Sequence, residues 1–158
     1  MKFFVSREIH NNRLLVWVLV ISTLFFTALW VTNLLLYSKV GFGPDAILRY
    51  YRGSPEEFIP GRTYLGMLEE AHFHLFAMGM LFMTLGHLLL FTPLPWSLKG
   101  AILIGFAVGA FGDILGGFLI VYGSPRLVYA KIFSFWLLQA TNLAMLVSVA
   151  IFLGNSKD

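Results

Sequence analysis

The side chains best suited to chemistry lie in one apolar stretch in the middle of the chain. Three of the four histidines occur there together with two glutamates. They are Glu69, Glu70, His72, His74 and His87. Imidazole and carboxylate groups bind copper, iron and zinc, and imidazole also binds haem iron. Because ionisable groups are costly in an apolar environment, they indicate a functional site or a buried pair.

Helical spacing sorts these residues into two stripes. At about 100° per residue, side chains three, four or seven positions apart share one face. The first stripe holds Glu69, His72, Gly79, Met83 and His87, and the second holds Met67, Glu70, His74, Met78 and Leu81. Glu70 and His74 are four residues apart, so their side chains can touch. A carboxylate in that position can orient the imidazole or share a metal ion with it.

Histidines about four turns apart with glycines between them match the arrangement that two stacked b-type haems require. Gly79 and Gly86 would leave room for the flat macrocycles. The stretch from Glu69 to His87 resembles the haem-bearing helices of cytochrome b-type membrane proteins. The resemblance covers this stretch alone and implies haem b, with His72 or His74 as one iron ligand and His87 as the other.

The second ligand of each iron is not supplied by this stretch. No other apolar segment of the chain contains a histidine. We therefore expect the opposite axial position to be filled by Met145, by a second copy of the chain, or by another subunit. A homodimer or a complex with other redox subunits is thus predicted, with quinone as a possible electron partner.

Two other hypotheses remain open from the residues alone. A copper, iron or zinc ion without haem could be held by Glu69, Glu70, His72 and His74 together with Asp113, which lies at a similar depth on the third apolar segment. Asp113 could instead pair with His74 or Gln139, or pass protons. A proton-coupled carrier or an assembly subunit without a cofactor is the third hypothesis.

Composition identifies the environment in which these residues must work. The chain has 158 residues, of which 58% are hydrophobic and only 12% charged. Soluble domains carry about 25% charged residues, so an integral membrane protein is predicted. The absence of cysteine excludes disulfides, iron–sulfur clusters and covalently attached haem. A net charge of +3 gives no sign of nucleic-acid binding.

The elements that position these residues are four apolar segments, each long enough to cross about 30 Å of hydrocarbon. They cover approximately residues 14–37, 65–91, 98–121 and 130–153. Short links between the last three predict a single all-α domain, an up-and-down four-helix transmembrane bundle. The long loop 38–64 contains a short interfacial helix, because Pro44 and Asp45 suit a first turn and Ile47 and Tyr51 share a face.

Smaller signals complete the prediction. Small residues repeat along the third segment at Ala101, Gly105, Gly109, Gly112 and Gly116, a pattern typical of close helix packing. Tyrosines and tryptophans near the segment ends are typical of an interfacial belt. Lys2, Arg7 and Arg13 before the first segment, against Lys39 after it, favour cytoplasmic termini in a bacterial inner membrane. With no catalytic triad or phosphate loop, an accessory redox subunit is expected rather than an independent enzyme.

Overall fold

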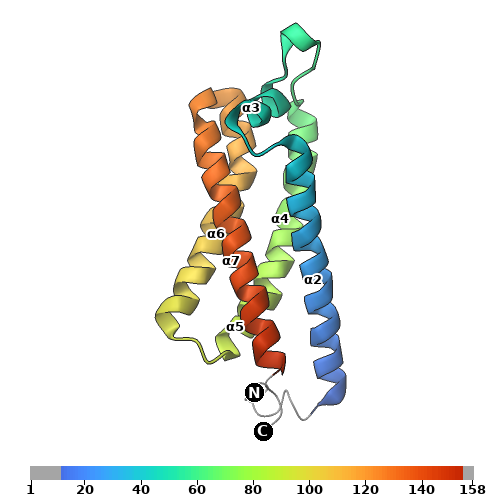
Figure 1. Cartoon of the computed structure of the whole chain (residues 1–158), viewed down its shortest axis with the longest axis vertical. Helices are drawn as coiled ribbons and strands as arrows, with labels where there is room; N and C mark the ends of the chain where they lie inside the picture. Colours follow the sequence, from blue (N-terminus) through green and yellow to red (C-terminus); the bar gives the residue numbers. More distant parts are fainter. Residues whose placement is uncertain (1–11, 155–158) are drawn as a thin grey trace.

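The computed structural model describes residues 12–154, so Lys2 and Arg7, used above for orientation, lie outside the described residues. Within that range the chain forms four long helical rods (Figure 1). Their elements are α2 (Arg13–Val40); α4 (Tyr64–Leu81), η2 (Phe82–Gly86) and α5 (His87–Phe91); α6 (Trp96–Phe118) and η3 (Leu119–Gly123); and η4 (Pro125–Leu127) and α7 (Val128–Gly154).

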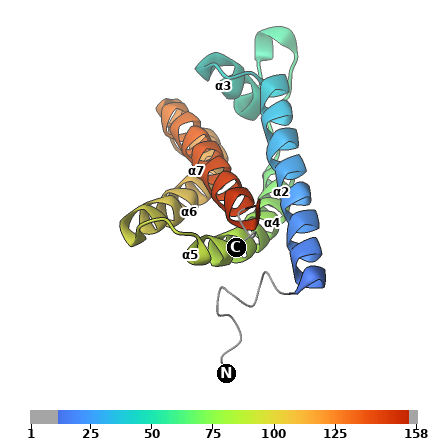
Figure 2. The same cartoon turned by 60° about the horizontal axis from the view of Figure 1, so that its bottom comes forward.

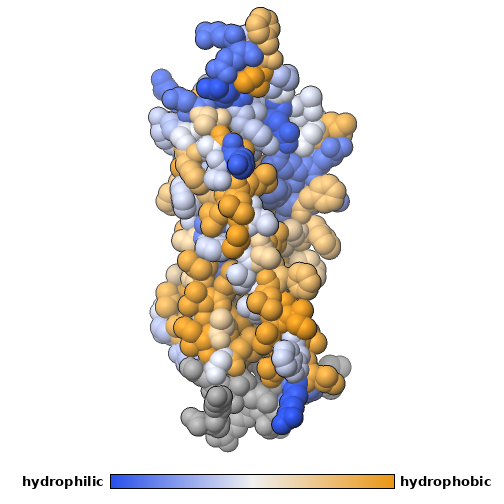
Figure 3. Space-filling model, turned by 45° about the vertical axis from the view of Figure 1, so that its right-hand side comes forward, coloured by the Kyte–Doolittle hydropathy of each residue, from blue (hydrophilic) through white to orange (hydrophobic). Residues whose placement is uncertain are grey.

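The prediction of a four-helix membrane bundle is confirmed. All four rods are long and apolar enough to cross a membrane. The rods cover residues 13–40, 64–91, 96–123 and 125–154, within five residues of the predicted bounds. The π-helical turns η2 and η3 continue the second and third rods without a break. Figure 3 shows hydrophobic residues over most of the visible rod surface and hydrophilic residues gathered at the end that carries α3. Contact with the lipid bilayer follows from this arrangement.

The long loop contains the predicted short helix, α3 (Pro44–Arg52), with Pro44 and Asp45 in its first turn. It lies across one end of the bundle (Figure 1). Ile47 and Tyr51 are buried in a small apolar cluster with Met67, Ile120 and Val128. The apolar face of α3 therefore packs on the ends of the spans and closes that end of the bundle. Beyond it, η1 (Pro55–Glu57) forms the tip of a hairpin that projects from the bundle.

The tightest helix pair is α6 with α7, which lie side by side in both views (Figures 1 and 2). Glycines make this approach possible, as the small-residue repeat predicts. A Cβ atom on Gly109 would lie 2.7 Å from the backbone nitrogen of Leu138. Gly105 and Gly116 face Thr141 and Lys131 of α7 in the same way. The stripe is therefore a helix-packing surface.

The opposite side of the bundle is more open. α2 leans on α7, and the indole nitrogen of Trp30 donates a hydrogen bond to the carbonyl of Gln139 at 3.2 Å. No residue of α2 is fully buried. Figure 2 shows α2 on the side of α7 that faces away from α6. Side chains of α2 and α4 line the space between these two helices, and the candidate site lies in that space.

Candidate functional site

The two stripes predicted on the second span face opposite ways. Met67, Met78 and Leu81 are buried, and Glu70 and His74 on the same stripe are half-buried. The other stripe, with Glu69, His72, Gly79, Met83 and His87, is exposed on the outer surface. The division into two stripes agrees with the burial of the residues, but Glu69 and His72 of the first stripe, also predicted as ligands, face outward. It is the Glu70–His74 face that points into the bundle.

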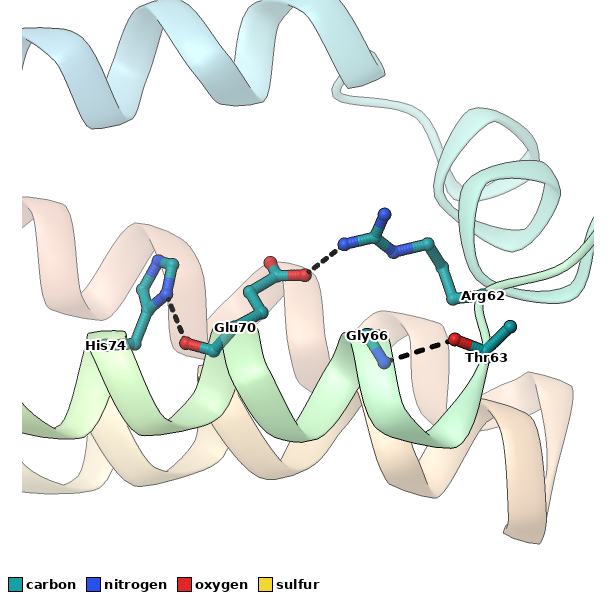
Figure 4. A network of polar contacts seen from close by, with 5 residues as sticks. All are labelled: Arg62, Thr63, Gly66, Glu70 and His74. Atoms are coloured by element: carbon teal, nitrogen blue, oxygen red, sulfur yellow. Dashed lines mark hydrogen bonds and ion pairs between the residues drawn. The ribbon is translucent and has the colours of Figure 1, made fainter.

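His74 is held by its own helix. Its Nδ1 lies 2.9 Å from the carbonyl oxygen of Glu70. A carbonyl can only accept a hydrogen bond, so Nδ1 carries the proton and Nε2 keeps its lone pair in the neutral ring. Figure 4 shows the ring extending from α4 on the same side as the Glu70 side chain. The imidazole is therefore oriented by the backbone carbonyl of Glu70, whereas the sequence predicted that the carboxylate would do so.

The carboxylate of Glu70 is bound by a residue of the loop. Arg62 Nη2 donates to Glu70 Oε2 at 2.8 Å (Figure 4). Next to Arg62, the side chain of Thr63 caps α4 by accepting a hydrogen bond from the Gly66 amide. This cap fixes the start of the helix and keeps Arg62 beside Glu70. The hydrogen bond to Glu70 raises the pKa of Arg62, which therefore stays charged.

Asp113 has a partner that the sequence did not reveal. Lys131 of α7 donates to Asp113 Oδ1 at 2.8 Å and to the Asp113 carbonyl oxygen at 2.7 Å. The lysine and aspartate side chains are only 5% and 14% exposed. The aliphatic stem of Lys131 lies against Gly116, where a Cβ atom would be 2.8 Å away. Gly116, one turn from Asp113, thus leaves the space that this stem occupies.

Glu70, His74 and Asp113 do converge, as their similar depth predicts. All three line a small cavity of about 50 Å³ at the α3 end of the bundle. Lys131 and Tyr51 also line it, and the Lys131 ammonium lies 5.2 Å from the centre of the Tyr51 ring. The cavity is therefore lined by one cation, two carboxylates, one imidazole and three tyrosines, and Arg62 lies beside it through its bond to Glu70.

A larger groove of about 370 Å³ separates α2 from α4. α2 contributes Leu29, Thr32, Asn33 and Leu36, and α4 contributes Phe73, His74, Ala77 and Met78. Its walls are mostly apolar. His74, Asn33 and Leu36 line both this groove and the small cavity, so the two spaces meet at the imidazole.

The carboxylates are not arranged as ligands of a bare metal ion. Within residues 12–154, no three histidine, cysteine, aspartate or glutamate side chains form a group that could hold one. Glu70 is engaged by Arg62, and Asp113 by Lys131. The geometry leaves His74 as the inward-facing side chain with a donor atom to offer.

Other predicted residues lie elsewhere. Glu69 and His72 on α4 and His87 on α5 are exposed on the outer face of the second rod, so two haems ligated there would need a second chain against that face. Gly79 lines a separate apolar groove between α4 and α6, of about 210 Å³. Gly86 is buried, and a Cβ atom there would meet Leu103 at 3.0 Å.

Three residues deeper in the fourth span, Met145, Gln139 and Asn142, line neither the groove nor the cavity. Met145 is fully buried in the main apolar core. Gln139 and Asn142 are also buried, and their side-chain oxygens have no hydrogen-bond partner among residues 12–154. Among the polar side chains of the spans, Asn33, Glu70, His74, Asp113 and Lys131 line the small cavity.

Residues 41–158 match the family model Aq_1264_TM, which is described as a transmembrane helical domain. The chain belongs to this family. No curated protein and no solved structure matches it.

The Aq_1264_TM match begins just before α3 and includes α4, α6 and α7, the three spans that carry His74, Asp113 and Lys131. His74, Asp113 and Lys131 lie inside the matched region, together with the roof formed by α3. α2, which carries the other side of the groove, precedes the match. The family description supports a membrane protein and assigns no chemistry to the site.

Proposed function

We propose that the chain is a membrane electron-transfer subunit that binds b-type haem, with His74 as an iron ligand. The observation that carries this proposal is the bond between His74 Nδ1 and the Glu70 carbonyl. Metal-ligating histidines characteristically donate their second ring nitrogen to a carbonyl or carboxylate, which fixes the ring and strengthens the free nitrogen as a ligand. His74 has that arrangement, and its free nitrogen belongs to a residue lining the groove.

The groove supports the same function by its size and lining. Cofactor sites commonly occupy about 300–1,000 Å³ and are mostly apolar with a few polar groups. The groove between α2 and α4 has about 370 Å³. Helical bundles hold cofactors between facing helices in this way. Because the groove ends at the polar cavity, it suits a ligand with an apolar body and a polar edge.

The single inward histidine sets the expected coordination. Along the part of the chain described, the groove contains no second histidine, and its one methionine, Met78, is on the same helix as His74. The iron would therefore take one strong ligand from this chain. We expect the reduced protein to bind carbon monoxide, which shifts its Soret band.

The test is the visible spectrum of the chain purified after haem-replete expression. We expect a Soret band that sharpens on reduction and that is lost in His74→Gln. His72→Gln and His87→Gln are matched controls on the exposed face and should keep it. A missing Soret band in the wild type, or one that survives in His74→Gln, would overturn the proposal.

The alternative of a bare copper, iron or zinc ion is tested on the same material. Elemental analysis would show stoichiometric metal without a Soret band. That metal would fall in Glu70→Ala, His74→Ala and Asp113→Ala. Protein with neither metal nor chromophore would leave the carrier or assembly subunit as the better explanation.

An electron-transfer subunit also needs partners. We infer that the exposed face of α4 receives a second copy of the chain or another redox subunit, and that quinone in the lipid is an electron partner. The chain has no cysteine, so single cysteines can report on this directly. Met83→Cys, at an exposed position of η2 on the same rod, should cross-link in membranes if two copies meet there, and Leu24→Cys on α2 should not. The predicted location is the bacterial inner membrane, with both termini in the cytoplasm.

A further inference from the structure

The polar cavity at the α3 end of the bundle is bordered by two buried hydrogen-bond donors that have no partner among residues 12–154. The hydroxyl of Tyr37 is buried and has no partner among residues 12–154. The Nε of Arg62 is in the same situation, although another nitrogen of its guanidinium binds Glu70. A buried polar group without a partner costs about 1–3 kcal/mol, so these groups favour an acceptor supplied by a ligand.

The two donors belong to one place in the fold. Tyr37 lines the cavity together with Tyr50 and Glu70. The Arg62 guanidinium stacks 5.0 Å above the ring of Tyr50 and is bonded to Glu70, so it sits beside the same wall. Tyr37 is itself held in place, because its ring stacks on Phe135 with centroids 3.6 Å apart.

The phenols on α3 add to the donor surface. Burial raises the pKa of both Tyr50 and Tyr51, and nearby Glu70 raises each further. Both hydroxyl groups therefore keep their protons at neutral pH and remain donors. Each carboxylate at the cavity already has a cationic partner, since Glu70 is paired with Arg62 and Asp113 with Lys131. Recognition here therefore rests on directed hydrogen bonds to oxygen.

The cavity lies beside His74 on the side of the loop. Figure 4 shows His74, Glu70 and Arg62 in succession along the same side of α4. A ligand held by His74 in the α2–α4 groove therefore has the cavity at its loop-side edge. Haem b has an apolar macrocycle and two carboxylates on one edge, which matches an apolar groove that ends in oxygen-seeking donors.

We propose that Tyr37 and Arg62 are the residues that bind the haem carboxylates, so that the carboxylate edge points toward α3. This inference rests on the proposed haem function and adds the orientation of the ligand and the residues that set it. Arg62 bridges Glu70 and one carboxylate, because a guanidinium has five N–H donors in a planar fork. Tyr37 donates its hydroxyl to a carboxylate oxygen.

The experiment compares haemin with haemin dimethyl ester, which has the same iron and macrocycle but blocked carboxylates. Each is titrated into the purified full chain in detergent and followed by its Soret band. A hydrogen bond to a charged group contributes about 1.5–3 kcal/mol, and 1.4 kcal/mol is tenfold in affinity. We therefore expect haemin to bind the wild type at least about tenfold more tightly than the ester.

The variants assign the effect to residues. Tyr37→Phe keeps the stack on Phe135, and Arg62→Lys keeps a charge near Glu70 while removing Nε. Each should weaken haemin binding by about tenfold and leave ester binding unchanged. The ratio of the affinity for haemin to the affinity for the ester therefore falls by about tenfold. Tyr122→Phe is the matched control, because Tyr122 is an exposed tyrosine at the same end of the bundle that does not line the cavity. It should change neither affinity.

The outcomes separate this inference from the function on which it rests. Equal affinities for haemin and its ester, with a Soret band that still depends on His74, would keep haem binding and overturn the carboxylate assignment. A normal preference in both Tyr37→Phe and Arg62→Lys would also overturn it. If neither porphyrin gives a Soret band that depends on His74, the proposed function fails and the inference fails with it.

Discussion

The two sides of the bundle are built on different principles. On one side, α6 and α7 meet through glycines, and α7 has eleven buried residues. On the other side, α2 has no buried residue and is separated from α4 by a groove of about 370 Å³. The first interface is closed by backbone-to-backbone approach. The second leaves a groove that is lined by side chains of both helices.

The site lies where these two sides meet. Lys131 and Asp113 come from the closed α7–α6 pair, while His74 and Asn33 line the open groove. A binding site needs rigid elements to hold its polar groups at fixed positions and a more open wall to admit the ligand. The difference between the two sides therefore predicts that mutations in the closed half cost stability and that mutations in the open half change ligand binding.

The largest effect should follow from breaking the buried ion pair. Removing one member of such a pair leaves an uncompensated charge and costs about 3–5 kcal/mol. Lys131→Met should lower the free energy of unfolding in detergent by that amount, because the Asp113 carboxylate is only 14% exposed. The double variant Lys131→Met, Asp113→Leu should recover part of the loss. Lys39→Met, at an exposed position on α2, is the control.

That comparison fails if Lys131→Met is no more costly than Lys39→Met. The ion pair would then contribute little to the closed half, and the difference between the two sides would rest on glycine packing alone.

The next effect compares two glycines. In Gly109→Ala the new methyl group would lie 2.7 Å from the Leu138 nitrogen and must push α6 from α7. Overpacking of this kind costs about 1–3 kcal/mol. Gly79→Ala meets nothing within 4 Å and gains helix propensity of about 0.5–1 kcal/mol. Detergent unfolding followed by circular dichroism should therefore move in opposite directions, and equal shifts would contradict the contrast.

The sequence predicts the membrane class, the four spans and the faces of α4 because each depends on local information. Apolar runs of about 20 residues and a 3.6-residue period are written in the chain itself. His74 and Glu70 were assigned to one face on this basis, and that face points inward. The prediction of close packing along the glycine repeat succeeded for the same reason.

The partners of the carboxylates are not local, and the sequence did not supply them. Lys131 is the second residue of the predicted span 130–153, where a charge is expected to lie at the membrane surface. Its long apolar stem carries the ammonium along Gly116 to Asp113. Arg62 likewise lies in the predicted loop 38–64. It precedes the start of α4 by two residues, and its guanidinium donates a hydrogen bond to the Glu70 carboxylate. Such pairs depend on how neighbouring helices and loops pack side by side.

The smallest effect concerns a region outside both sides, the hairpin beyond α3. Arg49 of α3 pairs with Glu57 of η1 at 2.7 Å, but their side chains are 53% and 48% exposed. Water and salt screen such a pair, and exposed pairs contribute up to about 1 kcal/mol. Glu57→Gln should therefore lower stability by less than that amount, and the difference should vanish in high salt. A loss as large as that of Lys131→Met would mean that the hairpin is coupled to the closed half through α3 and Tyr51, whose ring lies against Gly117 of α6.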